Sequence, residues 1–464
     1  MKTDHPLDLS DIGIDIFNEP VDLTAYRRDT SLVDPGQPDQ VARPSSVETL
    51  QAVLRRANES GTPVYVRGAG SMYAGGVNPH QNGLVLDMTG LNNIVDIDLA
   101  RGVVVVEPGV RFGALLKALR PHGMTIGIVP LTGPTATIGG AAASHALGTG
   151  SVRYQSFADE VLGLEVVLAD GQVLRTGSAA LENAGYFARH AFGPDLTGLF
   201  LGADATLGVI SKLALWLHPL PAARKTFCVG FPNTADGAKC IAHLQAQELI
   251  GDVWYASIYD QMAIQGRMSA AFPEQPAAKW PKFALGLDIG GLDEAQIQQT
   301  IQRITSVAAD HNGQEFAAFN EVFYRKLRYD ETFWYSFAGY FSRSRCGLLM
   351  TSLPADRVPA FYNTINEMRE KFTDFMWAPG AIVCRRGLHG GVIAFYDEQT
   401  QWQAMQTAFK ACTQALLEIG CVPYKSGKIW AQHMQALESH HGALSQIKAA
   451  LDINGIMSPG NLGL

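Results

Sequence analysis

The sequence predicts an α+β protein with two principal domains. Between residues 83 and 106, short runs of β-branched residues are separated by Gly or Asn turns, a pattern typical of closely spaced strands. Amphipathic helices are expected on either side of these strands, over residues 45–60 and 112–119. After Pro219 and Pro221 the chain changes to strands alternating with helices and carries more aromatic residues. We therefore expect a domain boundary at residue 221.

Composition favours small-molecule chemistry in the cytoplasm. The 464 residues are 47% hydrophobic and 17% charged, and the formal net charge of −8 disfavours a nucleic-acid or anionic-membrane partner. No apolar run reaches the roughly 20 residues of a membrane span, and the first residues lack the apolar core of a signal peptide. The six cysteines contain no Cys-x-x-Cys pair, which favours reduced, buried thiols.

The first helix leads into a glycine loop. Residues 26–44 are polar and proline-bearing and are expected to be an irregular lead-in. Ser45 and Glu48 have the spacing of a capping box, and Gly61 stands where the helix should end. A β-branched and aromatic strand follows over 62–66, and the loop 67–76 then reads Arg-Gly-Ala-Gly-Ser-Met-Tyr-Ala-Gly-Gly. Such a loop can turn sharply and present backbone N–H groups to a diphosphate, although on its own it also fits an ordinary tight turn.

The glycine spacing argues against a nicotinamide-type Rossmann unit, because Tyr73 occupies the third glycine position and no helix follows at once. Two further stretches, 131–150 and 202–208, consist mainly of small residues. They permit either a large flat ligand or close packing of a helix on a sheet. Between them, Asp170 and Gly171 separate two strand-like runs and predict a hairpin.

The second half supplies most candidate acids, bases and cations. Helices are expected over 297–307 and 400–417. As a group, the polar candidates indicate a substrate that is anionic or becomes so. They are Tyr324, Arg325, Arg328, Arg343, Arg345, Arg385, Arg386, His389, Tyr424, Lys425, Lys428 and His433. No metal site is expected, because His440 and His441 are adjacent and His389 has no partner at i+4.

Taken together, these segments resemble the vanillyl-alcohol oxidase and p-cresol methylhydroxylase superfamily of FAD-linked oxidases. The resemblance spans nearly the whole chain. It is carried by the motifs Pro63-Val-Tyr-Val-Arg-Gly-Ala-Gly-Ser, Val106-Glu-Pro-Gly-Val, Thr137-Ile-Gly-Gly, Gly163-Leu-Glu-Val-Val-Leu-Ala-Asp-Gly, Gly198-Leu-Phe-Leu-Gly and Thr206-Leu-Gly-Val-Ile-Ser. It implies an α+β fold: a two-part FAD-binding domain of the p-cresol methylhydroxylase type and an α+β substrate, or cap, domain built on an antiparallel sheet.

The resemblance also implies the cofactor and its contacts. FAD is expected, with its diphosphate held by Gly68 to Ser71. The implied cofactor-binding residues are Arg67, Gly68, Ala69, Gly70, Ser71, Gly75, Gly76, Pro108, Gly109, Thr132, Gly133, Thr137, Ile138, Gly139, Gly140, Ser144, Gly150, Tyr154, Gly208, Val209 and Ile210. Because the loop 68–76 contains no His, a covalent flavin link through His cannot form there, and we expect FAD to be held without a covalent bond. A covalent link from the second domain is the alternative.

The chain end resembles the segment by which such proteins return to the flavin domain, through Leu451-Asp-Ile-Asn-Gly-Ile-Met-Ser-Pro-Gly-Asn. The expected organisation is therefore an FAD-binding domain over 1–221, a substrate domain over 222–425 and a returning segment over 426–464.

Within the superfamily the sequence points two ways. Tyr26-Arg-Arg-Asp, Arg67-Gly-Ala-Gly and residues 74–76 are similar to the D-2-hydroxy-acid dehydrogenase branch, but the His-rich metal motif and Glu-His-Gly segment of that branch are missing. Cys421-Val-Pro-Tyr-Lys-Ser-Gly resembles the segment that holds a phenolate in the aryl-alcohol branch, with Lys425 where Arg is usual. The acidic catalytic residue of that branch, expected near Leu131 and Thr132, is also absent.

The expected reaction is oxidation of a small alcohol or 2-hydroxy acid by hydride transfer to flavin N5. His389 or Tyr424 is expected to take the hydroxyl proton, and Arg385, Arg386 or Lys425 to hold a carboxylate or phenolate. The alternatives are a para-substituted phenol oxidase or hydroxylase, and a flavin-binding electron-transfer subunit with little activity alone. The electron acceptor, oxygen or a redox partner, stays open, and a homodimer is a further expectation.

Overall fold

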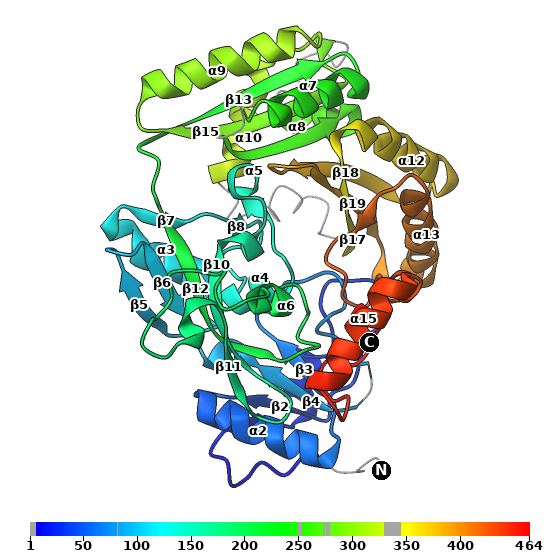
Figure 1. The fold of residues 1–464 in the computed structure, drawn as a ribbon. Coiled ribbons are helices and arrows are strands. Elements are labelled where there is room, and N and C mark those ends of the chain that lie inside the picture. The colour runs from blue at the N-terminus through cyan, green and yellow to red at the C-terminus, as the bar shows by residue number, and fades with distance from the viewer. Residues whose placement is uncertain (1–5, 81, 249–252, 272–273, 275–278, 329–344) are drawn as a thin grey trace.

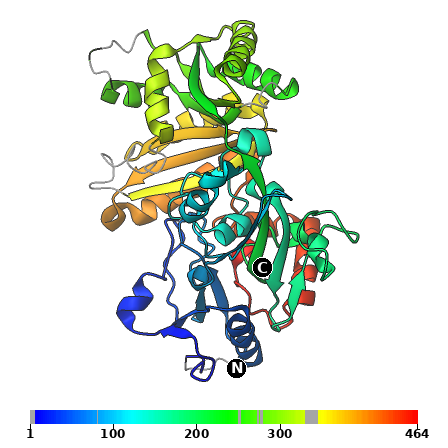
Figure 2. The same ribbon diagram turned by 90° about the vertical axis from the view of Figure 1, so that its left-hand side faces the viewer.

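The protein is described here from a computed structural model that covers residues 6–80, 82–248, 253–271, 274, 279–328 and 345–464. The chain forms two parts stacked along the long axis of the molecule (Figure 1), and the C-terminal helix runs back to the first part. Figure 2 shows the same two parts from the side. No helix in the described ranges combines the length and hydropathy that crossing a membrane requires.

A small mixed sheet begins the first part, with strand order β1-β2-β4-β3. β2, β4 and β3 are parallel, and β1 is antiparallel to β2. The strands are β1 (Asp15–Phe17), β2 (Gln40–Arg43), β4 (Leu84–Asp87) and β3 (Val64–Arg67). The expectation of an irregular lead-in over 26–44 was therefore wrong at its end: β2 pairs with β4 although its surroundings are polar and proline-rich.

Helix α2 (Val47–Ser60) covers this sheet with Leu50, Val53 and Leu54 fully buried. Its N-cap is Ser46, whose hydroxyl accepts the Thr49 N–H at 3.2 Å, so the predicted pair of Ser45 and Glu48 was displaced by one residue. The predicted end at Gly61 is confirmed, because this glycine is left-handed with φ of +67°.

A second, antiparallel sheet completes the first part in the order β11-β10-β12-β6-β5, and β7 also pairs with β12. The predicted hairpin is confirmed by β10 and β11, with Gly171 at φ +81° in the turn. The strands are β5 (Ile94–Asp98), β6 (Val103–Val106), β7 (Met124–Ile126), β10 (Val161–Val167), β11 (Val173–Arg175) and β12 (Val209–Pro219). The connecting elements are α1 (Pro20–Thr24), α3 (Phe112–Leu119), β8 (Val129–Pro130), α4 (Ile138–Ala143), β9 (Gly148–Thr149), α5 (Ser151–Tyr154) and α6 (Leu196–Phe200).

The second part is built on an eight-stranded sheet in which every pairing is antiparallel, in the order β16-β13-β15-β14-β18-β19-β17-β20. The strands are β13 (Ala223–Phe231), β14 (Val253–Asp260), β15 (Phe283–Gly291), β16 (Gln314–Glu315), β17 (Arg345–Leu353), β18 (Met376–Val383), β19 (Leu388–Tyr396) and β20 (Val422–Pro423).

The two faces of this sheet have different neighbours. Four helices pack on one face and form the largest hydrophobic core: α7 (Thr234–Ala246), α9 (Glu294–Ala309), α12 (Val358–Lys371) and α13 (Glu398–Glu418). α9 and α13 confirm the helices predicted over 297–307 and 400–417. The other face packs against α8 (Gln261–Ala271) and α10 (Ala317–Arg328) and faces the first part across a cavity.

The chain end comprises α14 (Ala431–Gln435), α15 (Glu438–Leu451) and the residues after them, of which Ile456 and Met457 pack in the core of the first sheet. The Val64 N–H donates to the Ile456 carbonyl and the Ser458 N–H donates to the Val64 carbonyl, both at 2.8 Å. Residues 456–458 therefore run beside β3, directly before the glycine loop. The exact domain limits at 221 and 425 stay predictions.

Candidate active site

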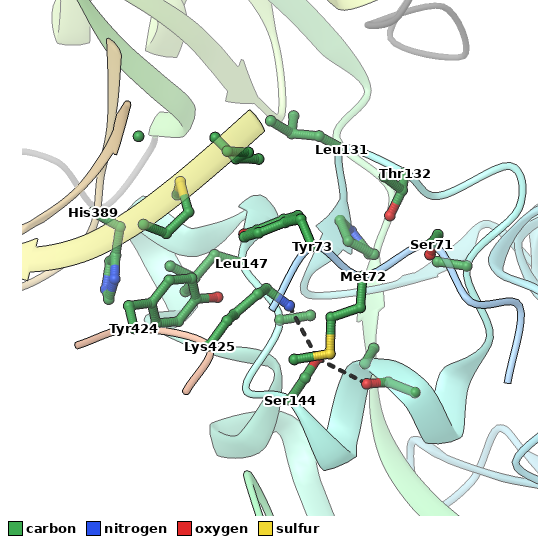
Figure 3. Close-up of a pocket in the computed structure, with 18 of the residues that line it drawn as sticks. Ser71, Met72, Tyr73, Leu131, Thr132, Ser144, Leu147, His389, Tyr424 and Lys425 are labelled. Atoms are coloured by element: carbon green, nitrogen blue, oxygen red, sulfur yellow. Dashed lines mark hydrogen bonds between the residues drawn. The ribbon is translucent and has the colours of Figure 1, made fainter. Parts of the chain in front are cut away.

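One cavity of about 400 Å³ separates the glycine loop from the large sheet. The first part lines it with residues from three segments, 66–77, 130–147 and 204–210, and with Met88, Pro108 and Phe200. The second part contributes residues from β14, α8, β17, β18 and β19, together with Tyr424 and Lys425. Figure 3 shows the two sides approaching each other, with Met72 and Tyr73 opposite Tyr424 and Lys425. All three glycine-rich or small-residue segments singled out in the sequence thus reach one space.

The loop after β3 offers free hydrogen-bond donors to this cavity. Among the described residues, the backbone N–H groups of Gly68, Ala69, Gly70 and Ser71 have no hydrogen-bond acceptor. Arg67 braces the loop from behind, because its Nη1 donates to the Arg28 carbonyl at 3.2 Å. Successive unpaired N–H groups in a loop containing a left-handed residue, here Gly70 at φ +65°, form a concave site for an anion.

Glycines also keep the cavity walls close together. A Cβ on Gly68 would lie 2.2 Å from Thr137 Oγ1, and a Cβ on Gly139 would lie 2.4 Å from Pro108 Cβ. Neither position accepts a side chain without movement of its neighbour. The backbone at Gly68 and Gly139 therefore lies directly against the side chains of Thr137 and Pro108, an approach that the absence of a Cβ permits.

Lys425 places a cation in the cavity near the glycine loop, with its Nζ 5.9 Å from the centroid of the Tyr73 ring. Its Nζ donates to Ser144 Oγ at 2.9 Å, and its backbone is left-handed with φ of +54°. Burial lowers the pKa of Lys425 to about 8, while the charge of Asp204 opposes that decrease. Of the described residues that line the cavity, Lys425 is the one Lys or Arg.

His389 and Tyr424 lie side by side near Lys425, with ring centroids 4.4 Å apart (Figure 3). Nδ1 of His389 shares a hydrogen bond with Ser352 Oγ at 2.8 Å, and Nε2 has no partner within the described part of the chain. Burial and the nearby Lys425 lower the pKa of His389 to about 4, so the ring is neutral at physiological pH. The Tyr424 hydroxyl donates to the His145 carbonyl at 2.5 Å, and burial raises the pKa of this phenol well above its ordinary value.

Both halves of the chain match known families. Residues 38–177 match the FAD binding domain family, and residues 220–462 match the C-terminal domain of the FAD linked oxidases. The chain belongs to the FAD-linked oxidase family.

Relatives of this FAD-linked oxidase include hydroxy-acid enzymes. The chain is 31% identical to glycolate oxidase subunit GlcD of Bacillus subtilis, over 48% of its own length and 46% of the relative. It is 32% identical to D-lactate dehydrogenase of Archaeoglobus fulgidus, over 48% and 50% respectively. Each match thus spans about half the length of the relative. The solved structure of p-cresol methylhydroxylase with substrate bound matches over 97% of this chain and 94% of that one, with a TM-score of 0.83 and 20% identity.

The predicted p-cresol methylhydroxylase-type fold and the FAD-binding domain are therefore confirmed. The residues present fit the cofactor, because the unpaired N–H groups of Gly68 to Ser71 suit a diphosphate and the adjoining cavity is flanked by glycines. Thirteen of the predicted cofactor-binding residues line this cavity. They are Gly68, Ala69, Gly70, Ser71, Gly76, Pro108, Thr132, Thr137, Gly139, Gly140, Ser144, Gly208 and Ile210.

The other predicted cofactor-binding residues are not among those that line this cavity. They are Arg67, Gly75, Gly109, Gly133, Ile138, Gly150, Tyr154 and Val209. Several have structural duties of their own. The Gly150 N–H bonds to the Trp254 carbonyl, the Tyr154 ring packs 4.2 Å from that of His218, and the Gly75 N–H donates to Asp29 Oδ2 at 2.9 Å. Contact of these eight residues with the cofactor stays a prediction.

Arg385 and Arg386 are not brought to the cavity. They follow β18 at an exposed turn, where Arg385 lies 3.6 Å from Glu248 with 58% of its side chain exposed. The Arg386 N–H donates to Gln155 Oε1 at 2.9 Å. Of the wider group of polar candidates, Arg345 pairs with Glu398, whereas Arg343 and the side chains of Tyr324, Arg325 and Arg328 lie outside the described residues. No group of three or more metal-ligating side chains occurs in the described ranges.

Sequence reasoning missed Asp204, a buried carboxylate in the cavity wall. Burial raises the pKa of Asp204 to about 6, so it is largely ionised at neutral pH. Its Oδ2 accepts the Gly427 N–H at 3.0 Å, which holds the segment that carries Lys425. The only sequence signal was its place inside the small-residue stretch 202–208.

Lys428 and Asn461 connect the chain end to the glycine loop. Lys428 Nζ donates to the Asn78 carbonyl at 2.8 Å, to Asn461 Oδ1 at 2.7 Å and to the Gly75 carbonyl at 3.3 Å. Nδ2 of Asn461 donates to two backbone carbonyls, that of Gly76 at 2.9 Å and that of Asp204 at 3.0 Å. Two backbone groups of the cavity wall are thus held by one buried amide.

We expect Asn461→Ala to lower the free energy of unfolding by about 3 kcal/mol, because it leaves two buried carbonyls without a donor and removes an acceptor from Lys428. FAD affinity should fall as well, since the Gly76 carbonyl of the glycine loop loses its donor. Chemical denaturation and flavin titration measure both effects. The control is Asn454→Ala, which removes hydrogen bonds from an exposed Asn of the same segment. Equal stability of the two variants would contradict this assignment.

Proposed function

We propose that this protein uses FAD to oxidise a CH–OH donor, an alcohol or 2-hydroxy acid. The observation that carries the proposal is that a neutral His389 and Lys425 line the same cavity. Gly68 to Ser71, whose backbone N–H groups are unpaired, line this cavity too. The named activities of the relatives, glycolate oxidase and D-lactate dehydrogenase, support a hydroxy-acid donor.

The loop Gly68–Ser71 would hold the FAD diphosphate, and the neighbouring segments 137–140 and 208–210 would contact the cofactor through backbone groups. When bound, FAD supplies an acceptor for a hydride at N5. Lys425 binds the carboxylate or phenolate of the donor, and its link to Ser144 fixes its ammonium in place. His389 takes the hydroxyl proton: its neutral ring has a free Nε2, and its Nδ1 is oriented by Ser352.

Tyr424 is a positioning residue in this proposal. Its hydroxyl is engaged as a donor to the His145 carbonyl, and its raised pKa keeps the proton in place. We therefore assign the role of base to His389 and not to Tyr424. Arg385 and Arg386 take no part, because they do not line the cavity.

Anaerobic flavin bleaching with lactate, mandelate, vanillyl alcohol and 4-alkylphenols tests the proposal. Reduction by the alcohols or hydroxy acids supports it. Reduction by 4-alkylphenols alone would identify a phenol oxidase or hydroxylase instead, and a flavin that no donor bleaches would indicate an electron-transfer subunit. Reoxidation of the photoreduced protein in air would then separate an oxidase from a dehydrogenase. Non-covalent FAD, a homodimer and a cytoplasmic location stay predictions from the sequence.

The pH dependence of anion binding tests the role of Lys425. The protonated form binds an anion and predominates below the pKa of about 8, so Lys425 itself adds no pH dependence well below that pH. Protonation of Asp204, whose pKa is about 6, should raise the affinity further as the pH falls. Above the pKa of Lys425, the affinity should fall about tenfold per pH unit as the ammonium loses its proton. Lys425→Met should bind weakly without this dependence, and Lys425→Arg should stay charged to higher pH. Titrating the flavin spectrum with benzoate measures the affinity, and an identical pH profile in Lys425→Met would exclude the role.

A further inference from the structure

On the cavity face of the large sheet, two paired strands carry a polar residue, His389, at one end and small or apolar residues beyond it. In the register of β18 and β19, Ile382 pairs with His389, Gly380 with Gly391, and Ala378 with Ile393. Alternate residues of a strand share a face, so these three pairs lie in sequence along one surface, and all six residues line the cavity. A track of small and apolar residues therefore leads away from His389.

Gly380 leaves open space in the middle of this track. A Cβ built on it meets no atom closer than the Ile258 carbonyl oxygen at 3.7 Å, and its φ lies outside the left-handed region. The fold therefore tolerates a side chain at position 380, in contrast to Gly68 and Gly139. Glycine inside a strand destabilises the fold relative to a residue with a side chain. Because packing does not require glycine at position 380, we explain it by the space that it leaves for a ligand.

The surroundings of the track are apolar on the side of β17, where Leu348 and Met350 line the cavity, as does Phe395 of β19. On the side of β14 the lining residues Ser257 and Tyr259 are polar, and the Ser257 hydroxyl donates to the Tyr259 hydroxyl at 2.6 Å. The described lining residues carry charge only at Lys425, Asp204 and, when protonated, His389. Two residues rise about 6.6 Å along a strand, so the distance from His389 to Ile393 is about 13 Å. This length accommodates an aromatic ring with a short chain attached, and exceeds what lactate or glycolate fills.

We propose that the track over Gly380 and Gly391 binds an extended apolar substituent of the substrate, and that Gly380 sets how bulky this group can be. The inference rests on the proposed function, because it takes His389 and Lys425 as the end that binds the reacting group. The favoured substrate is then a hydroxy acid or alcohol with a large alkyl or aryl substituent.

Carboxylates that cannot be oxidised test the proposal without turnover. Acetate, benzoate and 4-butylbenzoate are titrated against the FAD-loaded protein and followed by the flavin spectrum. We expect the affinity to increase in that order for the wild type. In the series Gly380→Ala, Gly380→Val and Gly380→Leu, binding of 4-butylbenzoate should weaken progressively, at least tenfold for Val, while acetate binding changes less than threefold.

Ala378→Leu provides a second variant, because position 378 lies one pair further from His389 and already carries a Cβ. It should weaken the binding of 4-butylbenzoate and leave that of benzoate unchanged. If Gly380→Val does not retain FAD, this variant tests the proposal in its place. The proposal is overturned if the wild type shows no preference for the longer carboxylate, if all three carboxylates weaken equally, or if neither position yields a variant that retains FAD. A wild type that binds this series as expected but is reduced by no CH–OH donor would instead refute the proposed function and leave the track in place.

Discussion

Gly68→Val is expected to lower FAD affinity about 100-fold. The new Cβ would overlap Thr137 Oγ1, at 2.2 Å in the present geometry, and Thr137 cannot withdraw freely because its hydroxyl accepts the Gly140 N–H at the start of α4. Overpacking of this kind costs about 1–3 kcal/mol, and at its upper end about two orders of magnitude in a dissociation constant. The loop 68–71 would have to move, and its N–H groups would no longer converge on the diphosphate.

Flavin content after purification and fluorescence titration of the FAD-free protein measure this effect. Gly113→Val is the matched control, because Gly113 lies in α3 and a Cβ there meets no atom within 4 Å. The control should bind FAD as the wild type does. Wild-type affinity in Gly68→Val would show that the loop does not hold the cofactor.

His389→Ala is expected to slow flavin reduction by about 10²–10⁴-fold, the usual contribution of a positioned general base. The ring has a pKa of about 4, so the rate with wild-type protein should fall only as the pH approaches 4 and the ring takes up a proton. Above that pH the base is already neutral and the rate should not depend on its titration. Anaerobic stopped-flow measurement of the bleaching rate gives both quantities.

Tyr424→Phe is the comparison for this experiment. The substitution removes a hydroxyl whose proton is directed to the His145 carbonyl, and it keeps the ring against His389. We expect less than a tenfold decrease in the reduction rate. A large decrease in Tyr424→Phe together with an unchanged rate in His389→Ala would reverse the two assignments.

The fold was accessible from the sequence wherever local patterns were strong. Helices such as α9 and α13 and the β10–β11 hairpin followed from periodicity and from the turn at Asp170 and Gly171, because both depend on contacts between residues close in sequence. Strand β2 was missed, since its place beside β4 arises from pairing with a strand more than 40 residues away. Its own residues carry no comparable signal.

The residues of the candidate site likewise fall into those that were predictable from the sequence and those that were not. The glycine loop 67–76 was recognisable in the sequence as a candidate diphosphate site, because glycines leave a readable pattern where the backbone must turn and approach a ligand closely. Which polar residues lie beside it depends on tertiary contacts. Arg385 and Lys425 look alike as charges in the sequence, but one lies on an exposed turn and the other is buried against Ser144. Asp204 holds the segment that carries Lys425 through Gly427, which lies 223 residues further along the chain, and such a contact has no local signature in the sequence. The place of Gly380 in the cavity wall depends likewise on how the large sheet packs against the first part.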